Sequence, residues 1–107
     1  MATATLSLDR VHDWASFHRE SARAFGFPDS YGGNNNAWID CLSYMDDGDD
    51  SSKFELAPGE QLVVHLDGFT EFSRRCPDVA DALPDLVAAV NSRYTLPKLV
   101  LVAQDAA

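Results

Sequence analysis

Basic residues are scarce in this sequence. Its 107 residues include 8 lysines and arginines against 17 aspartates and glutamates, which gives a formal net charge of −9. Binding to nucleic-acid phosphates requires clustered Lys and Arg, and an anionic membrane surface likewise attracts basic segments. We therefore expect neither a nucleic acid nor a membrane as a partner.

Long apolar runs are also absent. No stretch approaches the roughly 20 apolar residues that span a bilayer. The first ten residues, MATATLSLDR, have neither the basic region nor the apolar region of a secretory signal. A cytoplasmic protein is therefore expected. The length, together with 46% hydrophobic residues, fits a single domain over residues 1–107 with a modest core.

Residues for metal binding and catalysis are few. The two cysteines, Cys41 and Cys76, are too few for a disulfide framework. They are either structural thiols or a redox pair, and a pair requires Cα atoms within about 7 Å. The three histidines are dispersed, and the acidic run DDGDDSS at 46–52 lacks the spacing of a calcium loop. We expect no metal, no cofactor and no enzymatic activity, because no acid–base or nucleophile constellation is visible.

The acidic residues are concentrated in one segment. Residues 26–60 contain eight acids and a single base, Lys53. One interpretation is that acidic loops keep a small domain soluble. The other is that the segment attracts a cationic partner and accelerates its association.

Strand and helix patterns alternate along the chain. Strands are predicted at Ala2–Leu8, Gln61–Leu66 and Lys98–Val102, and helices at Val11–Phe25, Asn34–Met45, Phe69–Arg75 and from Pro84 to Val90 or Arg93, with 77–83 as a connector of some helical character. Helices that connect successive strands imply a parallel sheet. On the first helix, Glu20 is expected to face outward.

The stretch FPDSYGGNNNAWIDCLSYM, residues 27–45, joins a glycine-rich loop to a helix. Gly26 suits a helix end, Pro28 opposes continuation, and Asn34 is a good N-cap. Helical spacing places the following residues on a polar face: Asn36, Ile39, Asp40 and Ser43. An exposed Ile39 beside Asp40 is typical of an interface centre ringed by polar groups.

This stretch resembles the barstar family of intracellular ribonuclease inhibitors. The matching residues are Phe27-Pro28-Asp29, Tyr31-Gly32, Asn34, Ala37 and Asp40-Cys41-Leu42, preceded by Phe17-His18 and Phe25. The resemblance implies a two-layer α/β fold with a three-stranded parallel sheet and four helices. It also implies that a loop and the second helix plug a ribonuclease active site, with Asp40 in place of an RNA phosphate.

Several positions depart from the family pattern. An aromatic residue is expected where Ser30 stands, an acid where Asn36 stands and a Trp where Ile39 stands. A Gly-Trp pair is replaced by Tyr44-Met45, and Ala88, Ala89 and Val90 stand near the place of an acid on the last helix. These departures predict a partner other than barnase, with the acids of 46–50 supplying part of the lost charge.

We therefore predict an inhibitor or immunity protein that binds a basic ribonuclease or other toxin in a 1:1 heterodimer and is a monomer when free. Loop 28–34 and helix 34–45 form the predicted surface, with partner contacts from Ser30, Tyr31, Gly32, Gly33, Asn34, Asn36, Ile39, Asp40, Ser43 and Tyr44. The alternative is an interaction module on the same scaffold whose partner is a non-nuclease toxin or a regulator.

Overall fold

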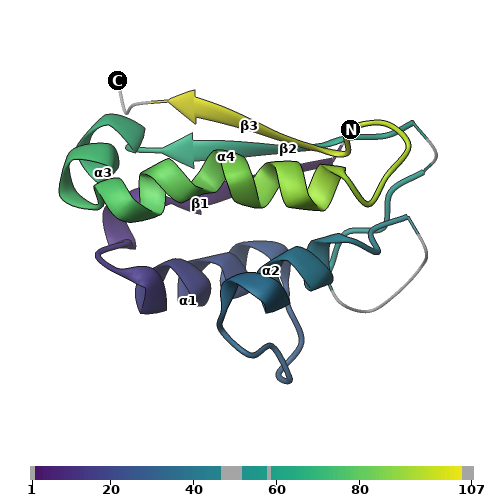
Figure 1. Ribbon diagram of the computed structural model, residues 1–107, viewed down its shortest axis with the longest axis horizontal. Coiled ribbons are helices and arrows are strands. Elements are labelled where there is room, and N and C mark those ends of the chain that lie inside the picture. The colour runs from purple at the N-terminus through teal and green to yellow at the C-terminus, as the bar shows by residue number, and fades with distance from the viewer. Residues whose placement is uncertain (1, 47–51, 58, 105–107) are drawn as a thin grey trace.

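The computed structural model describes residues 2–46, 52–57 and 59–104. Its elements, in chain order, are β1 (Ala2–Ser7), the 3₁₀ helix η1 (Leu8–Arg10), α1 (Trp14–Phe25), α2 (Asn35–Leu42), β2 (Leu62–Asp67), α3 (Phe69–Arg75), α4 (Pro77–Asn91) and β3 (Leu99–Gln104). Figure 1 shows α4 running alongside the strands, with α1 and α2 together below it. The predicted order of strands and helices is confirmed.

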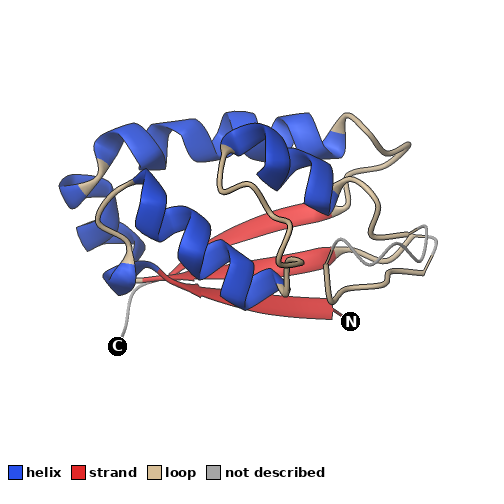
Figure 2. Ribbon diagram, turned by 90° about the horizontal axis from the view of Figure 1, so that it is seen from below, coloured by secondary structure: helices blue, strands red, loops and turns tan. Residues whose placement is uncertain are grey.

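The three strands form one parallel sheet in the order β1-β2-β3. Burial alternates along β2, where Leu62, Val64 and Leu66 are buried and the residues between them are half-buried. This period-two pattern is that of a sheet with one covered face. The helices lie on one side of the strands (Figure 2), so the fold has two layers, as predicted.

The core lies between these two layers. Its largest fully buried side chains are Trp38, Phe17, Phe25 and Phe72, and aliphatic residues from all three strands surround them. Trp38 comes from α2, so the helix that carries the candidate surface is anchored in the same core as the sheet. Burying a side chain of this size stabilises the fold by roughly 3 kcal/mol or more relative to exposure.

Several predicted elements differ from the structure in their bounds, and the difference in α4 involves two prolines. Residues 77–83 are helical, and Pro84 lies inside α4 rather than in its first turn, which Pro77 occupies. An internal proline removes the hydrogen bond to the Ala80 carbonyl and costs about 3 kcal/mol. The side chains of Val79, Leu83, Leu86 and Val90 are all buried, and this stripe outweighs the proline penalty.

The first helix begins later than predicted. It starts at Trp14 because Asp13 forms a capping box with Ser16: the Asp13 carboxylate accepts the Ser16 backbone N–H at 2.8 Å. Glu20 was expected to face outward but is buried, 6% exposed, and accepts hydrogen bonds from the Arg23 guanidinium. A paired, buried carboxylate avoids the cost of an isolated buried charge.

Parts of the acidic segment lie outside the described residues. These are Asp47, Gly48, Asp49, Asp50 and Ser51, and the same holds for Pro58 and residues 105–107. Cys41 is half-buried, Cys76 is buried, and no disulfide joins the two. Within 2–46, 52–57 and 59–104, no helix is long and apolar enough to cross a membrane.

Candidate binding surface

The loop before α2 is fixed to the end of α1 by backbone bonds and aromatic rings. Gly26 ends α1 in the left-handed conformation, φ 67°, and the Phe27 N–H donates to the Ala22 carbonyl at 3.1 Å. The Phe27 ring then lies against two others, with centroids 5.5 Å from Phe25 and 4.6 Å from Tyr31. The predicted helix end at Gly26 is confirmed, and the loop leaves it in a defined direction.

His18 links this loop to α2 through both of its ring nitrogens. Its Nε2 lies 3.1 Å from the Asn35 amide oxygen, and its Nδ1 lies within hydrogen-bond distance of the Tyr31 hydroxyl. Because an amide oxygen only accepts, Nε2 carries the proton and the Tyr31 hydroxyl donates to Nδ1. Burial lowers the pKa of His18, and the hydrogen bond to Asn35 opposes this shift. Burial also raises the pKa of Tyr31, with the Cys41 thiol adding to the rise.

The three consecutive asparagines have three different roles. Asn34 is the N-cap of α2, as predicted, and its side-chain oxygen accepts the Ala37 N–H at 2.8 Å. Asn35 accepts from His18, a role that no sequence pattern indicated. Asn36 is exposed on the outer side of the first turn.

The two glycines before the cap differ in what they require. Gly33 has φ 70°, a conformation that L-residues other than glycine rarely adopt, and a Cβ there would meet no atom within 4 Å. Gly32 has no such dihedral, but a Cβ would lie 3.2 Å from the Asn34 side-chain nitrogen. Together with exposed Ser30, both glycines leave the loop tip open to solvent.

Helix α2 divides into a core face and a surface face. On the core face, the Trp38 indole N–H donates to the Ser21 hydroxyl at 3.1 Å, and Leu42 is fully buried. On the surface face the Asp40 side chain is 61% exposed. Ile39 was expected to be exposed, but it is half-buried and packs against the core.

Ser43 lies in a different environment from the one the helical pattern predicted. It is buried, 6% exposed, and its hydroxyl donates to the Ile39 carbonyl. The predicted helix 34–45 is shorter, because α2 ends at Leu42 and Ser43 is its C-cap. Tyr44 is exposed, which leaves it available as a contact.

Tyr94 accounts for this early helix end. Its hydroxyl donates to the Leu42 carbonyl at 2.6 Å and accepts the Met45 N–H at 3.1 Å. These bonds replace those that another helical turn would make. They also join α2 to the segment between α4 and β3, and α2 itself packs on α4.

Asp40 has a cationic neighbour from a distant part of the chain. The Arg93 guanidinium, two residues after α4 ends, lies 3.6 Å from the Asp40 carboxylate. Sequence reasoning missed this contact, because 53 positions separate the two residues and neither lies in a motif with the other. Asp40 stands in the last turn of α2, where the helix dipole disfavours an acid. The local stability of α2 therefore does not explain why an aspartate stands at position 40.

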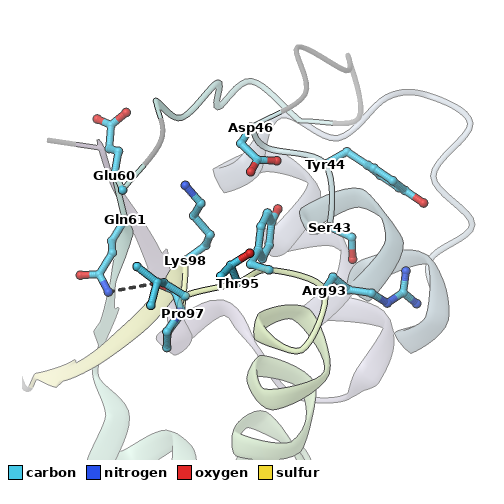
Figure 3. A pocket seen from close by; sticks show the side chains of 12 residues that line it. Ser43, Tyr44, Asp46, Glu60, Gln61, Arg93, Thr95, Pro97 and Lys98 are labelled. Atoms are coloured by element: carbon cyan, nitrogen blue, oxygen red, sulfur yellow. Dashed lines mark hydrogen bonds between the residues drawn. The ribbon is translucent and has the colours of Figure 1, made fainter.

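A groove of about 780 Å³ lies beside this pair, between the end of α2 and the segment before β3. We call it the α2–β3 groove. Ser43, Tyr44 and Asp46 line it, together with residues 59–61 and 93–98. Figure 3 shows Arg93 and Tyr44 on one side and Lys98 on the other. The Lys98 ammonium is held inward, where it donates to the Ala57 carbonyl at 3.2 Å.

This surface presents groups suited to recognition. An exposed carboxylate stands on a capped helix, beside an open loop and a groove. In the described ranges no group of three or more His, Cys, Asp or Glu side chains is placed to hold a metal ion. The arrangement suits charge-assisted hydrogen bonds to a cationic group on another molecule.

The fold and this surface define a small two-layer α/β protein with an acid presented on its second helix. A family model described as Barstar (barnase inhibitor) matches residues 1–104. The chain therefore belongs to the barstar family, whose members are inhibitors rather than enzymes. A comparison with curated proteins found no match.

Proposed function

We propose that this protein inhibits a ribonuclease-like toxin in a 1:1 complex by plugging its active site with loop 28–34 and the segment 34–45 that contains α2. The observation that carries the proposal is Asp40, an exposed acid on an anchored helix that gains nothing from the helix dipole. The description of the family as barnase inhibitors supports a ribonuclease as the partner.

Asp40 would take the place of an RNA phosphate. A ribonuclease holds phosphate oxygens with cationic side chains, and a carboxylate oxygen accepts the same charge-assisted hydrogen bonds. Because α2 is capped at Asn34 and anchored by Trp38, the backbone that carries the carboxylate is held in place before the partner arrives. Such preorganisation reduces the entropy lost on binding. A desolvated interface acid of this kind can be a dominant hot spot, and the barstar aspartate is the standard example.

The loop and the flanking side chains would surround this central acid. Tyr31, Gly32 and Gly33 would shape the loop and present backbone groups, while Ser30 and Asn36 would add exposed polar contacts. Ser30 and Asn36 differ from the family pattern, so the proposed partner is a ribonuclease other than barnase.

The remaining predicted contacts lie along α2. Asn34 would act mainly through its cap, and Ile39 would contribute the part of its side chain that the core leaves uncovered. Tyr44 would be a rim contact. Ser43 would contribute no side-chain contact, since its hydroxyl is buried.

A titration tests the proposal. Barnase and a panel of barnase-type ribonucleases are titrated with the protein at low salt, and RNA cleavage is followed. We expect one enzyme to be inhibited at a 1:1 ratio, and Asp40→Ala to weaken inhibition at least about a hundredfold. Glu71→Ala is the matched control, since Glu71 is an exposed acid on α3 that is also paired with an arginine. Equal loss in both variants would refute the role of Asp40.

A second candidate is an interaction module whose partner is not a nuclease. Arg93 favours it, because this cation partly offsets the charge that would attract a phosphate-binding cleft. Under this alternative, Asp40→Ala would still weaken binding to the partner, but no ribonuclease of the panel would be inhibited.

A further inference from the structure

The ion pair between Asp40 and Arg93 is loose. The closest nitrogen and oxygen are 3.6 Å apart, whereas a charge-assisted hydrogen bond is about 2.7–2.9 Å long. The two side chains are 61% and 47% exposed, and ion pairs this accessible contribute little to stability. Both charges therefore keep the capacity to bind groups on another molecule.

The backbone at Arg93 is nevertheless well fixed. Its N–H donates to the Val90 carbonyl at 3.0 Å, and the next residue, Tyr94, donates to Asn91 at 3.1 Å. The Tyr94 hydroxyl bonds to the Leu42 carbonyl of α2. The Arg93 side chain therefore extends from a fixed backbone position beside α2. This position is near the C-terminal end of α4, where the helix dipole favours positive charge.

A fixed cation beside Asp40 restricts what a partner can present. A partner cation that reaches the Asp40 carboxylate also comes close to the Arg93 guanidinium. As the interface closes and water leaves, the repulsion between these like charges grows. An arginine buried without an acceptor is costly as well. A carboxylate on the partner, next to its own cation, removes both problems.

Apolar groups extend the same surface across the α2–β3 groove. Three large hydrophobic side chains are exposed in the described parts of the chain, Tyr44, Leu96 and Val102, and the first two line this groove together with Arg93. Leu96 is 67% exposed. Tyrosine, arginine and exposed apolar side chains gathered at one place are characteristic of a protein interface.

The geometry points to a bipolar docking surface, formed by Asp40 and Arg93 and flanked by Tyr44 and Leu96, that binds a protein face carrying a cation with a carboxylate beside it. This inference rests on the proposed function and narrows the chemistry of the partner. It also extends the interface beyond loop 28–34 and α2, onto the segment between α4 and β3.

Charge variants of Arg93 test the inference on the ribonuclease of the panel that the wild type inhibits most tightly. We expect Arg93→Ala to weaken inhibition about tenfold and Arg93→Glu about a hundredfold, because a partner carboxylate loses its cation and then faces an acid. Arg93→Lys is expected to retain most of the affinity. The matched controls are Arg74→Ala and Arg74→Glu, since Arg74 is an exposed arginine paired with an acid on α3. Thermal unfolding shows whether each variant is folded.

The complementary changes are made on the enzyme. Each surface carboxylate at the rim of the inhibited active site is changed to lysine. We expect one such variant to be bound poorly by the wild type and to be bound again by Arg93→Glu.

The outcomes distinguish failure of the bipolar surface from failure of the proposed function. Inhibition that is lost with Asp40→Ala but unchanged or tighter with Arg93→Ala would overturn the bipolar surface and leave the proposed function standing, since Arg93 would then only compete for Asp40. If the wild type inhibits no ribonuclease of the panel, both the proposed function and this inference are rejected.

Discussion

His18 shows how much of the loop geometry depends on one side chain. Its ring bonds to Tyr31 on the loop and to Asn35 in the first turn of α2, and it is 5% exposed. Both ring nitrogens are used, so this one side chain joins the loop to the first turn of α2. Protonation of His18 would place a second N–H where the Tyr31 hydroxyl now donates.

This leads to a prediction about stability and pH. The pKa of His18 is lowered by burial in the folded protein. The unfolded chain therefore binds more protons than the folded chain once the pH falls below the ordinary histidine pKa of about 6.5. The stabilising contribution of neutral His18 to the free energy of unfolding is fully present above about pH 6.5. It is lost as the pH falls through the lowered pKa of His18 in the folded state.

The measurement is urea unfolding of the wild type and of His18→Gln at several pH values from 7.5 to 5. We expect the wild type to lose more stability than the variant over this range. The comparison cancels the titration of the carboxylates, which both proteins share. Parallel losses would contradict the prediction.

At the scale of elements, α2 is held by a cap at one end and by Tyr94 at the other. The Asn34 side chain satisfies the Ala37 N–H, and the Tyr94 hydroxyl satisfies the Leu42 carbonyl. A helix of eight residues is marginal on its own. Its stability therefore depends on these ends and on Trp38 in the core.

We expect Asn34→Ala to reduce the free energy of unfolding by about 1 kcal/mol, because the N-cap bond is lost. Asn34→Asp keeps an oxygen at the same place and adds a charge that the helix dipole favours, so it should be nearly neutral. Chemical denaturation monitored by circular dichroism measures both. Equal destabilisation by the two variants would show that the amide nitrogen, rather than the cap oxygen, matters.

The sequence predicted the elements whose signals are local. Asn34 as a cap, Gly26 as a helix end and the bounds of α3 follow from neighbouring residues, and all are confirmed. Pro77 and Pro84 both suit a first turn, so a local rule could not choose between them. In the structure the helix begins at Pro77, because a helix that starts there buries Val79 and Leu83 in the same stripe as Leu86 and Val90.

The candidate surface was harder to predict, because contacts between distant segments shape it. The position of Ser43 depends on where α2 ends, and that depends on Tyr94. The pairing of Asp40 with Arg93 likewise joins segments that only the fold brings together. The family resemblance supplied Asp40 but not its neighbour, because Arg93 belongs to no motif that we recognised.

For the whole molecule, charge decides how a partner approaches. The net charge is −9, and residues 26–60 carry most of it. A field of this sign accelerates the approach of a cationic protein and is screened by salt. Its effect lies mainly in the association rate, whereas contacts such as Asp40 act mainly on dissociation.

The prediction concerns the acids of the run at 46–50. Changing Asp46, Asp47, Asp49 and Asp50 to Asn should slow association with the inhibited ribonuclease several-fold at low salt and leave the dissociation rate unchanged. Stopped-flow kinetics measures both rates. At about 0.5 M salt the variant and the wild type should associate equally fast, because the Debye length is then only a few ångströms. A changed dissociation rate would mean that these acids contact the partner directly.

The contact between Trp14 and His18 gives the protein an internal optical reporter. The two rings are stacked, with centroids 5.9 Å apart and planes 24° from parallel, and both line the small cavity beside residues 33–36. An imidazolium quenches the emission of a neighbouring indole more strongly than a neutral imidazole does. The fluorescence of Trp14 should therefore follow the charge of His18, and any molecule that covers the loop should change it. The second tryptophan, Trp38, is buried and supplies a steadier background against which that signal is read.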